Sequence, residues 1–159
     1  MYRKSFSLVV ISLMVIGIVV LGTRLVAAIP GFGGAPSSYD PHVKVEDAVK
    51  TSTHPLLVEF YTDTCNTCRL ITPWMHELSK KHKNDLTFVM VDVDNPDNSQ
   101  IADIFGVPYV PIIYVFDFKH MTKAQVDINS YGSLRNLDQA IQVAGDHVKQ
   151  QALSRRQHS

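Results

Sequence analysis

The two cysteines of the chain constrain its fold more than any other feature. Cys65 and Cys68 stand three positions apart and directly follow the mostly apolar run 56–61, which has the length of a strand. A helix that begins at such a pair offers free backbone N–H groups and a positive dipole end, and both stabilise a thiolate. Because only the thiolate attacks a disulfide, the pattern predicts a redox dithiol at a strand–helix junction, with Cys65 as the attacking sulfur.

Two other uses of the cysteines fit the chain less well. A zinc site needs four ligands, and the candidates His76 and His82 lie six residues apart on one predicted helix, on different faces. A disulfide between residues three apart closes so small a loop that it adds little stability. We therefore expect no metal and no cofactor. The remaining alternative to a redox centre is a binding module in which the cysteine pair takes no part in redox chemistry.

An uncharged apolar segment occupies the N-terminus. It covers the nineteen residues 5–23, with two basic residues before it and Arg24 after it. The length fits both a membrane-spanning helix and a signal peptide cleaved after Ala28, and we favour an uncleaved anchor within 1–28. The positive charges at the start predict that this end stays inside and that the rest lies outside the cytoplasm, which in a bacterium is the periplasm.

Composition divides the remaining chain into a connector and one domain. Residues 29–40 are rich in Gly, Pro and Ser, which is typical of a flexible linker. We expect the domain over 41–153, followed by a tail over 154–159, and a monomer. Three of the 15 basic residues precede residue 30, which leaves 12 basic against 15 acidic residues and a net charge of −3. No basic stripe is present, so a nucleic-acid partner is not expected.

Helical and extended patterns alternate along the domain. Apolar residues at helical spacing predict helices over 43–50, from the dithiol through at least Ser79, over 100–105 and over 134–153. Runs of strand length predict strands over 56–61, 86–93, 112–116 and 124–128. This order predicts an α/β fold in which helices flank a central mixed β-sheet. The core face of the helix after the dithiol is expected to carry Leu70, Ile71, Trp74 and Leu78.

Four features in sequence order make the chain resemble the thioredoxin superfamily over roughly residues 41–153. They are the strand at 57–61, the Cys65/Cys68 pair, Pro73 and the segment Gly106-Val107-x-x-Val110-Pro111. The resemblance implies a thioredoxin-like fold and a thiol–disulfide oxidoreductase. It also implies that the Val110–Pro111 bond is cis and lies beside the dithiol, where the backbone of Val110 would pair with an extended substrate strand.

The chain departs from the family pattern around the dithiol. Thr64 stands in place of the usual Trp, and Asn66-Thr67 in place of Gly-Pro. Glu59 occupies the position of a buried acid, but the next strand lacks the Lys that faces this acid in many members. Burial without a cation raises the pKa of a carboxyl, so Glu59 is the candidate to take the proton of Cys68. A solvated position at the sheet edge is the alternative for Glu59.

The expected chemistry is exchange of disulfides with protein substrates. Cys65 attacks a substrate disulfide, and the shielded Cys68 then attacks Cys65 to release the reduced substrate. The chain has no histidine between the cysteines, which favours a reductant supplied with electrons by a membrane thiol reductase. An oxidase or isomerase remains open. Arg69 either supports the thiolate or lies on the helix surface.

Overall fold

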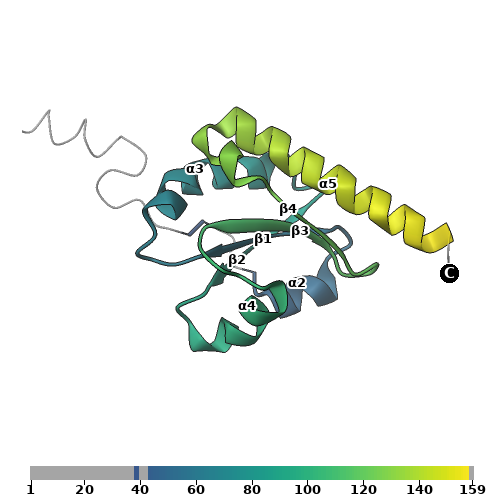
Figure 1. Ribbon diagram of the computed structural model, residues 1–159, viewed down its shortest axis with the longest axis horizontal. Coiled ribbons are helices and arrows are strands. Elements are labelled where there is room, and N and C mark those ends of the chain that lie inside the picture. Colours follow the sequence, from purple (N-terminus) through teal and green to yellow (C-terminus); the bar gives the residue numbers. More distant parts are fainter. Residues whose placement is uncertain (1–37, 40–42, 158–159) are drawn as a thin grey trace, which may run out of the picture. The chain divides into compact units, whose positions relative to one another are not determined.

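The computed structural model describes residues 38–39 and 43–157 (Figure 1). The predicted anchor or signal segment 1–28 lies outside these residues, as does nearly all of the connector 29–40. Within the described part of the chain, no helix is long and apolar enough to cross a membrane. The membrane segment therefore stays a prediction from the sequence.

A mixed four-stranded sheet forms the centre of the domain, with the strand order β2-β1-β3-β4. The central strand β1 pairs in parallel with β2 and antiparallel with β3, and β3 pairs antiparallel with β4. All six residues of β1 are buried, as expected for a strand covered on both faces. The mixed sheet confirms the predicted fold class. The strands are β1 (Leu56–Tyr61), β2 (Thr87–Asp92), β3 (Ile112–Asp117) and β4 (Thr122–Gln125).

Helices cover both faces of the sheet. On one face lie α3 (Asn66–Lys81) and α5 (Leu134–Gln157), and on the other lie α2 (Val45–Thr51) and α4 (Ser99–Phe105) (Figure 1). Two short 3-10 helices complete the described elements, η1 (Pro96–Asn98) and η2 (Ile128–Gly132). Side chains alternate along β1 between the two cores: Leu57 packs with α3 and α5, and Val58 packs with α2 and α4.

Two boundaries in the C-terminal part differ from the expected ones. Helix α5 runs to Gln157 instead of ending near residue 153, and no glycine or proline interrupts residues 153–157. Basic residues in its last turn also interact favourably with the helix dipole. Strand β4 begins at Thr122 rather than at residue 124, and it ends before Asp127, whose carboxylate accepts the backbone N–H of Asn129. This local hydrogen bond starts η2 in place of the expected strand end.

The buried face of α3 differs from the expected one at Leu70, whose side chain is 40% exposed. Cys68, Ile71, Met75 and Leu78 are buried instead, at spacings of three and four residues that form one helical stripe. Leu70 lies beside this stripe because adjacent helix positions point in directions about 100° apart. Cys68 is therefore the first residue of the stripe that packs on the sheet.

The packed domain begins before residue 41. Tyr39, near the end of the predicted connector, is only 4% exposed and belongs to the core between the sheet and α3 and α5. Its ring meets Phe88 edge-on, with ring centroids 6.4 Å apart. Its backbone N–H donates to Sδ of Met90 at 3.1 Å. Tyr39 is thus part of the core rather than of a flexible linker.

We expect Tyr39→Ala to lower the free energy of unfolding by about 3 kcal/mol, because it removes a buried ring and leaves a cavity. Urea unfolding followed by circular dichroism measures this change. The control is Val143→Ala on α5, where the side chain is 66% exposed, and we expect it to change stability by less than about 0.5 kcal/mol. An equally small effect of Tyr39→Ala would contradict the packing of this residue.

Candidate redox site

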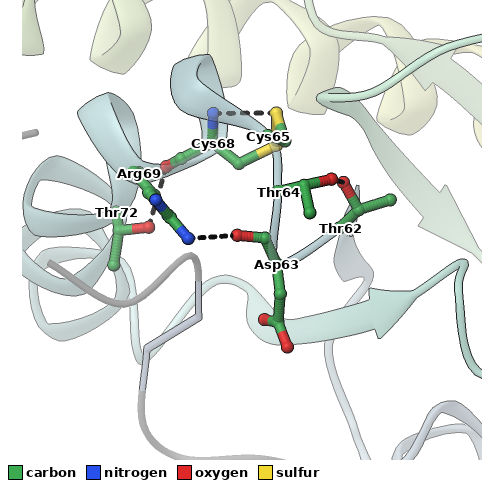
Figure 2. Close-up of a disulfide and its surroundings, with 7 residues drawn as sticks. All are labelled: Thr62, Asp63, Thr64, Cys65, Cys68, Arg69 and Thr72. Carbon is green, nitrogen blue, oxygen red and sulfur yellow. Dashed lines mark hydrogen bonds between the residues drawn. A yellow bond between two sulfur atoms is a disulfide. The ribbon is translucent and has the colours of Figure 1, made fainter. Parts of the chain in front are cut away.

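The two cysteines form a disulfide across the first turn of α3, with their Cα atoms 5.3 Å apart (Figure 2). Cys65 is the N-cap residue, and its Sγ accepts a hydrogen bond from the backbone N–H of Cys68 at 3.1 Å. Cys65 is partly exposed, whereas Cys68 is fully buried. In the reduced state, a sulfur that meets solvent and a helix N-terminal amide is suited to be a thiolate.

The loop between β1 and α3 fixes the position of Cys65. The backbone N–H of Cys65 donates to the carbonyl of Thr62 at 3.2 Å, and the hydroxyls of Thr62 and Thr64 lie 3.3 Å apart. From the helix, the guanidinium of Arg69 donates to the carbonyl oxygen of Asp63 at 2.5 Å (Figure 2). Arg69 therefore connects this loop to α3. This role differs from both expected ones, which were support of the thiolate and a position on the helix surface.

Glu59 lies in the middle of β1 and is fully buried. Since side chains alternate along a strand, Glu59 points to the same face as Leu57, into the core beneath α3 and α5. Its neighbours in register are Met90 on β2 and Ile113 on β3, both apolar. Neither carboxyl oxygen has a hydrogen-bond partner in the described part of the chain. The alternative of a solvated edge position is therefore wrong.

Burial raises the pKa of the Glu59 carboxyl well above its usual value. No charged group contributes to this shift, which agrees with the expected lack of a lysine on the neighbouring strand. A carboxyl of this kind gains basicity and can act as a proton acceptor closer to neutral pH. The role of Glu59 in catalysis remains a prediction.

The Val110–Pro111 peptide bond is cis, as the resemblance implies. Pro111 is buried and directly precedes β3. The approach from α4 turns at Gly106, whose positive φ of 67° favours glycine and whose N–H donates to the carbonyls of Ala102 and Asp103. Val110 packs partly against the core on the α2 and α4 side. Its pairing with a substrate strand remains a prediction.

Two tyrosines near Glu59 were not among the sequence candidates. Tyr39 and Tyr131 are both 4% exposed and lie in the same core as the Glu59 side chain. Burial raises the pKa of each tyrosine above its usual value, and the charge of Glu59 raises it further. The one sequence signal for Tyr39 is an aromatic residue at the end of a Gly/Pro/Ser-rich segment.

Among residues 38–39 and 43–157, no three His, Cys, Asp or Glu side chains are grouped so that they could hold a metal ion. His82, one of the two candidates on α3, instead forms a hydrogen bond of 2.7 Å with Asp138 on α5.

Fold and site together define a thioredoxin-fold redox protein. The thioredoxin family model matches residues 41–142, and the chain belongs to the thioredoxin family.

Several known proteins are similar to parts of the chain. Thioredoxin-like protein HCF164, chloroplastic, from Arabidopsis thaliana is 40% identical over 57 residues, which are 36% of this chain and 22% of that protein. Thioredoxin of Rickettsia bellii is 27% identical over 89 residues, covering 56% of this chain and 83% of the relative. A solved structure described as "Structure of a malarial protein" aligns with a TM-score of 0.46 and 20% identity over 58% of this chain and 98% of that chain. The chain thus spans only about a fifth of the length of the HCF164 proteins it matches.

The buried Glu59 gives the stability of the protein a distinct pH dependence. Because its pKa is raised in the folded state, the folded protein keeps this proton at pH values where the unfolded chain has lost it. The contribution of Glu59 is therefore fully present below the unfolded pKa of about 4.3 and is lost as the pH rises toward the folded pKa. We expect Glu59→Gln to be more stable than the wild type at pH 8 by roughly 1–3 kcal/mol.

Urea unfolding of both proteins between pH 4 and pH 8 measures this difference, which should vanish near pH 4. The matched control is Glu77→Gln, on the exposed side of α3, for which the difference from wild type should not depend on pH in this way. A constant difference between wild type and Glu59→Gln would show that Glu59 ionises normally.

Proposed function

We propose that this protein is a thiol–disulfide oxidoreductase that acts on protein disulfides outside the cytoplasm and works as a reductant. The observation that carries the proposal is the Cys65–Cys68 disulfide at the N-terminus of α3, with one sulfur partly exposed and the other buried. Such an arrangement separates an attacking from a resolving sulfur. Membership of the thioredoxin family supports redox chemistry at this pair.

In the proposed reaction, the reduced protein donates two electrons to a substrate disulfide. The thiolate of Cys65, stabilised by the N–H of Cys68, attacks one substrate sulfur and expels the other as a thiolate that takes up a proton. Cys68 then gives its proton to the carboxylate of Glu59 and attacks Cys65. The bond between Cys65 and the substrate breaks, the second substrate thiol is released, and the Cys65–Cys68 disulfide remains.

A continuous reductant needs a source of electrons, because each turnover leaves the pair oxidised. Outside the cytoplasm the surroundings do not supply them, so a membrane thiol reductase acts as the donor and the apolar segment 5–23 keeps the domain near it. The reduction potential tests the direction. A value near −270 mV, about that of thioredoxin, supports a reductant, and a value near −120 mV, about that of DsbA, would indicate an oxidase.

Serine variants of the two cysteines distinguish a catalytic dithiol from a dithiol without redox activity. We expect Cys65→Ser to reduce insulin disulfides no faster than the uncatalysed reaction, because the attacking sulfur is gone. Cys68→Ser keeps the attacking sulfur but cannot resolve the intermediate, so it should accumulate a mixed disulfide with the substrate that mass spectrometry detects. An unchanged rate in Cys65→Ser would overturn the redox function and leave a binding module.

The preference of the site for protein disulfides over small-molecule disulfides can be tested at Tyr109. This residue precedes Val110 and is 46% exposed. An aromatic side chain beside a bound polypeptide contributes roughly 0.5–1.5 kcal/mol. We therefore expect Tyr109→Ala to lower kcat/KM for insulin about three- to tenfold and to leave the reduction of a small aromatic disulfide nearly unchanged. The control Val143→Ala should affect neither substrate. Equal losses for both substrates would contradict a contact with the polypeptide.

A further inference from the structure

A group of four polar atoms without hydrogen-bond partners lies in the core beneath α3 and α5. They are both carboxyl oxygens of Glu59 and the hydroxyl oxygens of Tyr39 and Tyr131. Buried polar atoms are almost always hydrogen-bonded, since each unsatisfied one costs free energy. In the described part of the chain, these are the only fully buried side-chain oxygens or nitrogens that lack a partner. Their occurrence in one core calls for a common explanation.

The two tyrosines are held near the neighbours of Glu59 on opposite sides of β1. Tyr39 is fixed over β2, because its backbone N–H donates to Sδ of Met90, the residue beside Glu59 in register. Tyr131 belongs to η2, which follows the segment where the N–H of Val126 donates to the carbonyl of Ile113 at 2.8 Å. Ile113 is the other neighbour of Glu59 in register. Tyr39 and the segment that leads to Tyr131 thus each contact one of the two neighbours of Glu59 in register.

The electrostatics agree with this placement. The charge of Glu59 acts on both tyrosines, and it acts on Tyr39 directly after burial in importance. Tyr109 and Asp127 also raise the pKa of Tyr131, and a backbone hydrogen bond at Ile113 lowers it. Cys68 begins the buried stripe of α3 that packs on the sheet. The described residues that β2, β3 and α5 contribute to this core are apolar. The buried hydroxyl of Thr72 on α3 already donates to the carbonyl of Cys68, whereas the hydroxyls of Tyr39 and Tyr131 have no partner and can serve the Glu59 carboxylate.

We propose that Tyr39 and Tyr131 are positioning residues that keep the Glu59 carboxylate ready to take the proton of Cys68, each hydroxyl donating to a carboxylate oxygen through one water. This inference rests on the proposed function, in which Glu59 is the proton acceptor. A hydrogen bond donated to a carboxylate favours the ionised form. The tyrosines therefore offset part of the effect of burial, and they take the place of a cation on the neighbouring strand.

The test uses the full chain with Tyr39→Phe, Tyr131→Phe and the double variant, which keep the rings and remove only the hydroxyls. The carboxyl carbon of Glu59, followed by NMR in the reduced protein, should titrate at higher pH in each single variant and highest in the double variant. On the acid side of the pH profile for insulin reduction, each substitution should lower the rate at least about threefold. The rate at high pH should be unchanged.

Two controls separate positioning from packing. Tyr114→Phe makes the same change at a buried tyrosine in the core on the opposite face of the sheet, and it should leave the titration of Glu59 unchanged. In a Glu59→Gln background, the loss of either hydroxyl should no longer shift the pH profile. A shift that persists in that background would overturn the proposal.

The titration also separates this inference from the proposed function. An unmoved titration of Glu59 in the Tyr39→Phe and Tyr131→Phe proteins would overturn the role of the tyrosines, even if the wild type reduces insulin efficiently. A wild type without reductase activity would overturn the proposed function, whereas the shifted titration would still establish that the tyrosines stabilise the carboxylate.

Discussion

The burial of β1 between two helical layers is the constraint on which the site depends. All six of its residues are buried, so a charged side chain in this strand is shielded from bulk solvent. The same strand ends directly before the loop that leads to Cys65, and the helix that follows packs on the sheet through a stripe beginning at Cys68. One central strand therefore determines both the position of the dithiol and the surroundings of Glu59.

Glu59 is the point at which the core departs from the rule that buried charges are paired. Its neighbours in register, Met90 and Ile113, could pack equally well around an apolar residue. The buried carboxyl therefore lowers the free energy of unfolding and forms no contact that the packing requires. Residues that break a local rule in this way concentrate at functional sites. The position of Glu59 in the core that Cys68 adjoins agrees with such a functional role.

Much of this fold follows from local pattern, and what does not follow depends on contacts between distant segments. The dithiol, the strands and the missing cation opposite Glu59 could be predicted because periodicity and pairing express them locally. Tyr39 could not, since composition assigns its Gly/Pro/Ser-rich segment to a linker and only its packing on Phe88 and Met90 places it in the core. Leu70 and Ile71 are adjacent and equally apolar, so only tertiary packing decides which one is buried.

The two groups around the dithiol act in opposite directions on the balance between its redox states. The N–H of Cys68 stabilises a thiolate on Cys65 and so favours the reduced form. An ionised Glu59 has the opposite effect, because a negative charge in the core that Cys68 adjoins disfavours a thiolate there. Destabilising the reduced form makes a dithiol a better electron donor. Tyrosines that keep Glu59 ionised would therefore favour the reducing direction as well as the transfer of the proton.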